Sequence, residues 1–363
     1  MEKGNIKPVL PPFLVTWSLT TKCNLICKHC YSESSPEAGY DDLTTEESLR
    51  VIDEIADWGI GLLVFDGGEP LLREDFFQIA DYASGKGITT GIGTNGTRLD
   101  AATARKLVRV GIRYVSISID GADADTHDAF RGEVGNFKKA LEAATACKQA
   151  GLPFQFKTVI RKKTITQISD IFRLATDYGA FGMGLFDLIL VGRARRECQD
   201  EVLTKEERKE VVEWLVQAQI DYPLTIETPS LPMYPLLLKL NVDKGVRPKH
   251  IPMEQLVRLA YYGRGCAAGR PRGYLVIRNN GEVNPCMFLQ INLGNVKGKS
   301  IRQIWQESPI LDQLRSREAL KGECRKCQYR DICAGCRGRA YAYSGDMLAS
   351  DPGCWLKPES EMV

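Results

Sequence analysis

Short apolar runs alternate with amphipathic helical patterns over the first 220 residues. Apolar stretches of four to nine residues predict buried strands, and apolar positions recurring every three or four residues predict helices packed on one face. The predicted strands are 13–19, 62–65, 88–92, 114–119, 154–160 and 183–191, and the predicted helices are 44–59, 75–83, 101–110, 136–150, 165–178 and 205–220. Six such strand–helix units joined by short connections are typical of a parallel α/β sheet.

Local signals mark several of these boundaries. Thr44 followed by Glu47 forms a capping box, and Asp100 is a second N-cap. Periodicity alone does not distinguish an open sheet from a barrel. Prolines crowd residues 221–262 and interrupt the alternation, and the chain becomes rich in Cys and Gly from about Gly263. We therefore divide the chain into an extension at 1–12, an α/β domain at 13–220, a bridging segment at 221–262 and a Cys-rich domain at 263–363.

Composition narrows the class of protein. The 363 residues are 44% hydrophobic, which indicates a globular protein. Their formal net charge is only +2, so the overall charge does not indicate binding to nucleic acid. Apolar runs fall short of the roughly 20 residues that span a bilayer, and residues 1–12 lack a signal-peptide core. We expect a cytoplasmic protein. Its twelve cysteines are then better interpreted as metal ligands than as disulfides.

Three of these cysteines stand close together after the first strand. Cys23, Cys27 and Cys30 have C-x3-C-x2-C spacing. Iron–sulfur clusters are normally held by four thiolates, so three would leave one iron open to another ligand. A zinc site completed by His29, or three buried thiols, is the alternative interpretation.

The loop Thr21–Tyr31 resembles the signature of the radical S-adenosylmethionine (SAM) superfamily, with Tyr31 at a position that is commonly aromatic. The resemblance implies a [4Fe–4S] cluster whose open iron binds SAM, which is cleaved to a 5′-deoxyadenosyl radical that removes hydrogen from substrate. It also implies a partial (β/α)6 barrel of the TIM type. Active residues would then lie at the carboxyl ends of the strands.

Further segments resemble the SAM site of this superfamily. Gly67-Gly68-Glu69-Pro70 follows the second strand and corresponds to the element that holds the SAM amino group. The resemblance places Thr94, Asn95, Ser118 and Asp120 beside SAM, and Lys157 at its carboxylate, although a surface lysine is an equal alternative. The G-x-G-x-x-G run at 91–96 does not open directly into a helix, as a dinucleotide site would. For His127, Asp128 and Arg131 we favour a loop-ordering ion pair over catalysis.

The C-terminal cysteines resemble the SPASM extension, which implies two auxiliary [4Fe–4S] clusters. By analogy one cluster is held by Cys324, Cys327, Cys333 and Cys354. The other is held by Cys266, Cys286 and Cys336, and because this set has three cysteines, one arrangement leaves an iron of that cluster open. Zinc ribbons are the alternative. Nearby basic residues would offset the thiolate charge: Lys321, Arg325, Lys326, Arg330, Arg337 and Arg339. Cys147 is predicted in a helix core and Cys198 in a polar loop.

Arg193 and Arg196 follow the sixth strand and predict a carboxylate-bearing substrate, with a solvated charge run as the alternative. The whole chain resembles the SPASM enzymes of alternative haem and haem d1 synthesis. That resemblance implies a tetrapyrrole carboxylate as substrate, modified for example by oxidative decarboxylation, and an external electron donor such as flavodoxin or ferredoxin. A peptide maturase, and a non-catalytic iron–sulfur or zinc scaffold, are the competing hypotheses. No general acid or base is assigned.

Overall fold

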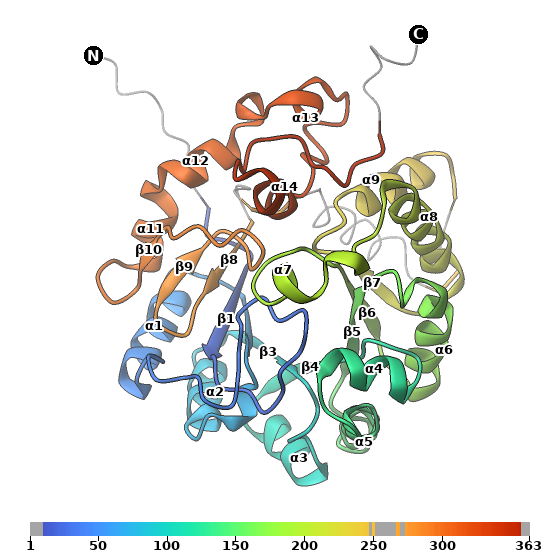
Figure 1. Ribbon diagram of the computed structural model, residues 1–363. Coiled ribbons are helices and arrows are strands. Elements are labelled where there is room, and N and C mark those ends of the chain that lie inside the picture. The colour runs from blue at the N-terminus through green and yellow to red at the C-terminus, as the bar shows by residue number, and fades with distance from the viewer. Residues whose placement is uncertain (1–9, 247–248, 251–265, 269–272, 357–363) are drawn as a thin grey trace, which may run out of the picture.

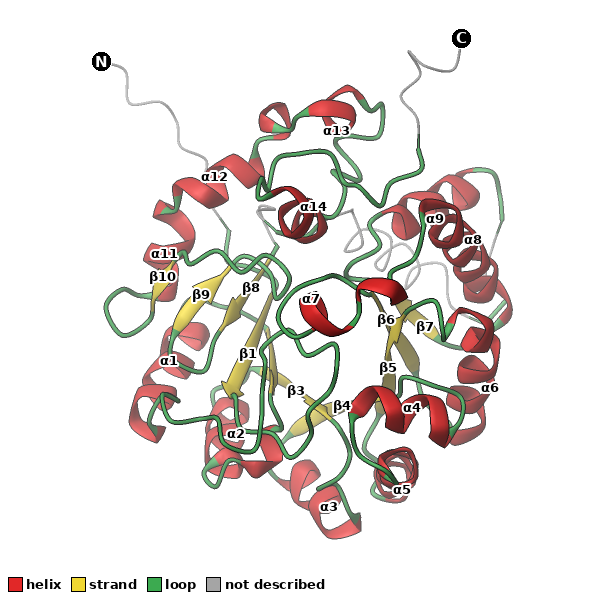
Figure 2. Cartoon of the chain, in the orientation of Figure 1, coloured by secondary structure: helices red, strands yellow, loops and turns green. Residues whose placement is uncertain are grey.

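The computed structural model describes residues 10–246, 249–250, 266–268 and 273–356. Seven strands lie side by side in chain order as parallel neighbours. They are β1 Leu14–Thr20, β2 Leu62–Gly67, β3 Thr89–Thr94, β4 Ile112–Ser118, β5 Phe154–Ile160, β6 Gly182–Asp187 and β7 Thr225–Glu227. Figures 1 and 2 show that they curve into a partial barrel with helices around its outside. The predicted fold class is confirmed.

The outer helices pack apolar side chains against the strands. They are α1 Thr45–Asp57, α2 Phe76–Gly85, α3 Ala101–Arg109, α4 Ala124–Arg131, α5 Asn136–Gln149, α6 Ile168–Tyr178 and α8 Lys205–Asp221. The predicted caps are present: Thr44 Oγ1 accepts a hydrogen bond from the Glu47 amide, and Asp100 accepts one from Thr103. Cys147 lies buried in this core, as predicted. None of the helices in the described part of the chain is long and apolar enough to cross a lipid bilayer.

The C-terminal part of the chain extends the same sheet. Strand β8 Tyr274–Ile277 pairs in parallel with β1, and β9 Glu282–Asn284 and β10 Gly294–Asn295 add antiparallel strands. The remaining helices are α11 Ile301–Glu307, α12 Pro309–Arg315, α13 Gly322–Lys326 and α14 Arg337–Ser344. In Figure 1 this orange-to-red part lies above the barrel and next to β1. Strand β1 is therefore an interior strand with a partner on each side.

Three details differ from the sequence prediction. The proline-rich bridge contains strand β7 and helix α9 Met233–Asp243 within its described residues. Strand β6 ends at Asp187, paired with Ile160, instead of Val191, and the Asp187 amide donates to Ser230 Oγ. His127, Asp128 and Arg131 lie in helix α4, not in a loop. A short helix, α7 Ala194–Glu197, follows β6 and lies over the barrel mouth in Figure 2.

Candidate active site

The main cavity opens at the carboxyl edge of the parallel strands, the edge that carries function in β/α barrels. It encloses about 1050 Å³ of empty space, counted out to its mouth. Nine predicted site residues line it: Cys23, Cys27, Cys30, Gly67, Gly68, Thr94, Asn95, Ser118 and Lys157. Residues from five different strand ends thus meet around one space.

The three cysteines of the first loop form a sulfur-only set of ligands beside this cavity. Their sulfurs accept backbone hydrogen bonds, from the Leu25 amide to Cys23 at 3.4 Å and from the Ser34 amide to Cys30 at 3.3 Å. Burial raises the pKa of Cys23 to about 12, and it also raises the pKa of Cys27. A buried thiolate therefore needs a metal or another positive centre to stay ionised.

The residues present fit an iron–sulfur cluster. Sulfur ligands on one short loop, N–H···S bonds and an adjoining cavity are what a three-thiolate cluster with an open iron requires. Within the described residues, no group of three or more His, Cys, Asp or Glu side chains is arranged to hold a single metal ion. His29 instead stacks on Phe130, with ring centroids 4.3 Å apart, and burial lowers its pKa to about 3.

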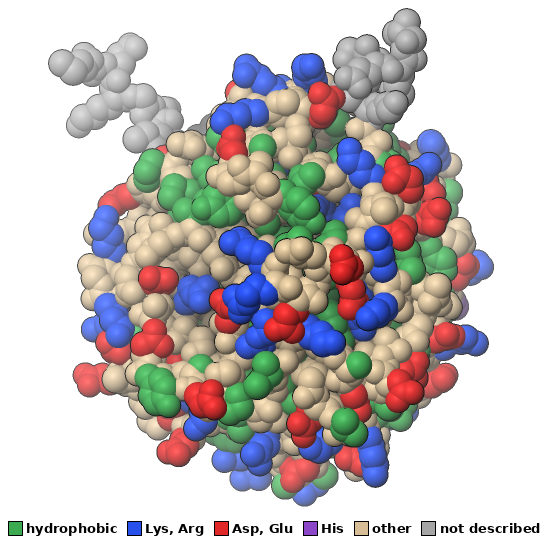
Figure 3. Space-filling model, viewed as in Figure 1, with side chains coloured by type: hydrophobic (Ala, Val, Ile, Leu, Met, Phe, Trp, Pro, Cys, Tyr) green, Lys and Arg blue, Asp and Glu red, His purple; other side chains and the backbone are tan. Residues whose placement is uncertain are grey.

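Arg193 stabilises the cysteine loop through hydrogen bonds to its backbone. Its guanidinium donates to the carbonyl oxygens of Cys27 at 2.7 Å and Ser34 at 2.8 Å, and its own amide donates to the Cys30 carbonyl. Arg196 forms an exposed ion pair with Glu33 of the same loop. Figure 3 shows basic and acidic side chains side by side around α7. Neither arginine is among the residues that line the main cavity, and both bind the cysteine loop; their contact with substrate stays a prediction.

Helix α4 holds the other side of the loop. Arg131 Nε and Nη2 each lie 2.6 Å from Asp120 Oδ2, and Nη1 lies 3.9 Å from the Cys27 sulfur. The predicted ion pair thus joins Arg131 to Asp120. Asp128 instead accepts from the amides of Gly135 and Phe137. Burial alone would raise the pKa of Asp120, but Arg131 and neighbouring positive groups hold it below its usual range. Asp120 therefore acts through Arg131 and does not line the cavity.

The GGEP segment places backbone, not its carboxylate, at the cavity. Gly68 packs so closely on the loop that a Cβ atom would lie 2.2 Å from the Lys22 carbonyl oxygen. Glu69 is fully buried and accepts hydrogen bonds from Thr94 Oγ1 and the amides of Asn95 and Leu71. Burial raises the pKa of Glu69 to about 7. Glu69 thus ties the ends of β2 and β3 together, and Pro70 begins the short 3-10 helix Pro70–Leu72 behind it.

Glycines in the strands make room for polar side chains inside the barrel. A Cβ at Gly91 would meet the Tyr114 ring at 2.5 Å, and one at Gly93 would meet Asp66 at 3.0 Å. Gly96, with φ of +83°, lies against Ala140 of α5. The three glycines of the G-x-G-x-x-G run at 91–96 are therefore explained by close packing at each position, where a larger side chain would not fit. Tyr31, which ends the cysteine signature, also lines the cavity, and so does Asp66, which belongs to none of the predicted motifs.

The C-terminal cysteines separate into two groups. Cys324, Cys327, Cys333 and Cys354 line one cavity beneath α13. Cys266, Cys286 and Cys336 form the other group: burial is the main cause of the raised pKa of Cys286 and Cys336, and the neighbouring Cys266 raises both further. Two of the six predicted basic residues donate to these sulfurs: the guanidinium of Arg337 to Cys324 at 3.4 Å, and the backbone amide of buried Arg339 to Cys336 at 3.4 Å. Cys198 is buried against Phe130 and Leu188, so its predicted polar surroundings were wrong.

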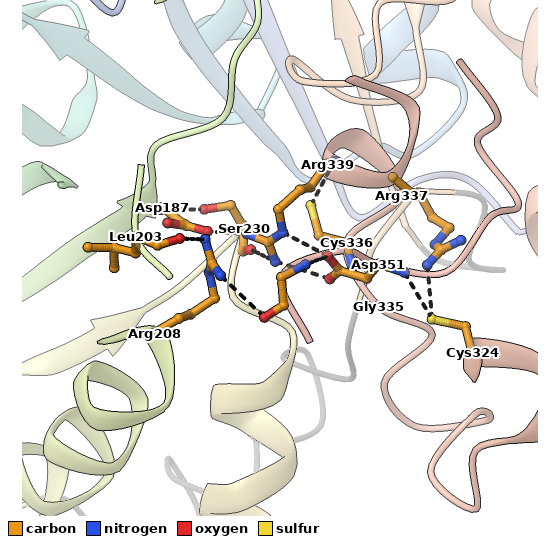
Figure 4. Close-up of polar contacts among 12 residues, drawn as sticks. Asp187, Leu203, Arg208, Ser230, Cys324, Gly335, Cys336, Arg337, Arg339 and Asp351 are labelled. Atoms are coloured by element: carbon orange, nitrogen blue, oxygen red, sulfur yellow. Dashed lines mark hydrogen bonds and ion pairs between the residues drawn. The ribbon is translucent and has the colours of Figure 1, made fainter. Parts of the chain in front are cut away.

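A buried ion network links the second group to the main cavity (Figure 4). Asp187, which lines that cavity, pairs through Oδ2 with Arg208 at 2.8 Å and with Arg339. Arg339 also pairs with Asp351 at 2.7 Å, and Asp351 accepts the Cys336 amide at 2.7 Å. Met287 and Phe288, which follow Cys286, line the same cavity. None of these links had a signal in the sequence.

Comparison with known proteins agrees with this architecture. Residues 17–175 match the family described as "Radical SAM superfamily", and residues 266–328 match "SPASM", an iron–sulfur cluster-binding domain. The fold resembles the crystal structure of Streptococcus suis SuiB bound to precursor peptide SuiA, with a TM-score of 0.73 and 16% identity, covering 95% of this chain and 76% of that one.

Two full-length relatives are more similar in sequence. The AdoMet-dependent heme synthase of Methanosarcina barkeri (strain Fusaro / DSM 804) is 35% identical over 96% of this chain and 97% of its own length. The pre-heme d1 synthase of Dinoroseobacter shibae (strain DSM 16493 / NCIMB 14021 / DFL 12) is 31% identical over 98% of this chain and 88% of its own length. An iron–sulfur cluster and SAM are thus the cofactors of this enzyme. The chain belongs to the radical SAM superfamily and carries a SPASM domain.

Proposed function

We propose that this enzyme removes hydrogen from a carboxylate-bearing side chain of a tetrapyrrole, in a reaction of the kind that makes haem or a related product. The observation that carries the proposal is the 35% identity to a heme synthase over nearly the whole of both chains. The cavity supports it, because the predicted cluster ligands and the predicted SAM-site residues line the same space.

The chain's own residues have distinct roles in the proposed site. Cys23, Cys27 and Cys30 would hold the cluster, and with SAM bound this pair supplies the 5′-deoxyadenosyl radical. The backbone at Gly67 and Gly68 would orient the SAM amino group, and Thr94, Asn95 and Ser118 would line the rest of its site. Glu69, Asp120 and Arg131 position these elements, as do Arg193 and Arg196.

The chemistry proposed is oxidative decarboxylation of a propionate side chain. The side chain gives one hydrogen atom to the radical, breaks its C–C bond to release CO2, and gives up one electron as a vinyl group forms. An electron acceptor is therefore required. We assign this role to an auxiliary cluster at Cys266, Cys286 and Cys336, since Met287 and Phe288 connect that site to the cavity. A second auxiliary cluster would be held by Cys324, Cys327, Cys333 and Cys354.

We place the enzyme in the cytoplasm, with flavodoxin or ferredoxin as external electron donor. We retain the sequence-based domain limits at 13–220, 221–262 and 263–363 as units of function, although β8 joins the barrel sheet.

The test is anaerobic reconstitution followed by dithionite, SAM and iron coproporphyrin III, with mass spectrometry of both products. We expect 5′-deoxyadenosine together with porphyrin species that have lost CO2 and two hydrogens. Iron content should approach about twelve atoms per chain, four for each cubane. The Cys27→Ser variant is the control and should form neither product. Zinc without iron, or 5′-deoxyadenosine with no change in the porphyrin, would refute the proposal.

A further inference from the structure

One row of side chains crosses the barrel interior below the cysteine loop. Ser118 on β4 pairs with Lys157 on β5, Lys157 with Gly184 on β6, and Gly184 with Glu227 on β7. Paired residues of neighbouring strands project to the same face of a sheet. Since Ser118 and Lys157 line the main cavity, this row faces its interior.

Gly184 provides the space into which Lys157 extends. A Cβ at Gly184 would lie 3.1 Å from Lys157 Cγ and 3.7 Å from Cε, so the lysine chain passes directly over this glycine. Glycine within a strand weakens it and often marks a place where another group approaches closely. The absence of a side chain at Gly184 on β6 thus leaves the space that the Lys157 side chain occupies.

The ammonium group of Lys157 faces the cavity, and no carboxylate among the described residues is hydrogen-bonded to it. Its nearest aromatic contact is the Phe186 ring, whose centroid lies 5.7 Å from Nζ. Within the described residues it forms no hydrogen bond or ion pair, whereas Arg131, the other cation at the cavity, is bound to Asp120. A half-buried ammonium that is not paired within the protein is suited to bind an anionic ligand.

The Lys157 side chain leans toward β6, because it passes over Gly184 and its Nζ lies 5.7 Å from the centroid of the Phe186 ring. Desolvation raises the pKa of Glu227, and the positive charge of Lys157 reduces that rise. Arg131 is the cation that contacts the cysteine loop, with Nη1 3.9 Å from the Cys27 sulfur. SAM bound at the open iron would have its carboxylate beside the cluster, so the position of Lys157 favours a second, deeper carboxylate.

We propose that Lys157 binds a carboxylate of the substrate and that Gly184 is required to seat it. This inference rests on the proposed tetrapyrrole function. A substrate with several carboxylates would be anchored by one of them at Lys157. That contact would determine which of its other side chains faces the SAM site.

The experiment compares binding of two ligands to the reconstituted enzyme. Iron coproporphyrin III and its tetramethyl ester are titrated by absorption spectroscopy, and SAM is titrated separately by equilibrium dialysis. The variants are Lys157→Met, which removes the charge at similar length, Lys157→Arg, which retains it, and Gly184→Ala, which crowds the lysine. Lys162→Met is the matched control, because Lys162 is exposed just beyond β5.

We expect Lys157→Met to weaken binding of the tetracarboxylate by about 10- to 100-fold, as for loss of a hydrogen bond between charged groups. Gly184→Ala should weaken it in the same direction, and Lys157→Arg should retain more affinity than Lys157→Met. SAM affinity, ester affinity and the Lys162→Met variant should change less than about twofold.

Three results would overturn the inference. Weaker SAM binding with unchanged porphyrin binding would assign Lys157 to the SAM carboxylate. Unchanged binding of both ligands would show that Lys157 anchors neither. If the wild-type enzyme does not bind the tetracarboxylate at all, the proposed function itself fails, which is distinct from a failure seen only in the Lys157 variants.

Discussion

Arg131 and Asp120 form a buried ion pair whose guanidinium also reaches the sulfur of Cys27. Asp120 is fully buried and its Oδ1 accepts the Val159 amide, so the pair connects β4, α4, β5 and the cysteine loop. Removing one partner of such a pair leaves an uncompensated charge in the interior, which costs more than the pair contributes.

We therefore expect Arg131→Met to lower the free energy of unfolding by about 3–5 kcal/mol, and to lower the amount of iron retained after reconstitution. Urea unfolding and iron analysis measure the two effects. Arg173→Met is the control, because the ion pair between Arg173 and Asp170 is exposed and its loss should cost less than about 1 kcal/mol. Equal losses in the two variants would contradict the structural role assigned to Arg131.

Gly132 and Gly135 offer a matched comparison at the end of α4. Both have positive φ, +78° and +83°, so alanine is strained at either position. A Cβ at Gly132 would also lie 2.8 Å from the Ile26 carbonyl oxygen, whereas nothing lies within 4 Å of one at Gly135.

We expect Gly132→Ala to unfold at a lower temperature than Gly135→Ala and to retain less iron, because only the first change pushes on the cysteine loop. Thermal unfolding and iron content of the reconstituted variants provide the measurement. A Gly135→Ala variant with the same iron loss would show that backbone strain alone is responsible.

Arg193 and Arg196 differ in burial although they lie three residues apart. Arg193→Met should remove two hydrogen bonds to buried carbonyl oxygens of the loop, at a cost of about 1–3 kcal/mol for each group left unpaired. Arg196→Met should change stability by less than about 0.5 kcal/mol, since its ion pair is at the surface.

Denaturant unfolding and the electron paramagnetic resonance signal of the reduced cluster measure these effects. If both variants kept stability and cluster but lost porphyrin affinity, the predicted contact of these arginines with substrate would be supported.

Glu69 predicts a pH dependence of stability. Burial raises its pKa from about 4.5 to about 7, so the folded state binds a proton more readily than the unfolded state. For an acid with a raised pKa, the stabilising contribution is complete below pH 4.5 and is lost as the pH rises to about 7. We expect the free energy of unfolding of the SAM-free wild-type protein, measured in urea, to fall between pH 5 and pH 8, and the Glu69→Gln variant to lack this fall. The same slope in both proteins would assign it to another group.

The sequence identified the elements whose signals are local. The capping box at Thr44 and Glu47 and the cysteine spacings are contained in a few neighbouring residues, and the structure has them as expected. Which way a side chain points at a strand end is decided by distant partners. Glu69 turns toward Thr94 and Asn95, and Arg193 toward Cys27, because those buried donors and acceptors require a partner.

Long-range pairing accounts for the other differences. Strand β7 has only three residues among prolines, and β8 pairs with a strand more than 250 positions earlier. The network through Asp187, Arg208, Arg339 and Asp351 joins three separate parts of the chain, so no single segment contains its pattern.

The pairing of β8 with β1 also bears on how the protein can be divided. If the chain were cut after the barrel repeats, the strand that leads into the cysteine loop would become a sheet border with unpaired amide and carbonyl groups, inviting association with other chains. The two regions matched by family comparison, 17–175 and 266–328, therefore belong to one sheet, and expression of the barrel part alone should give an aggregating product instead of a minimal enzyme.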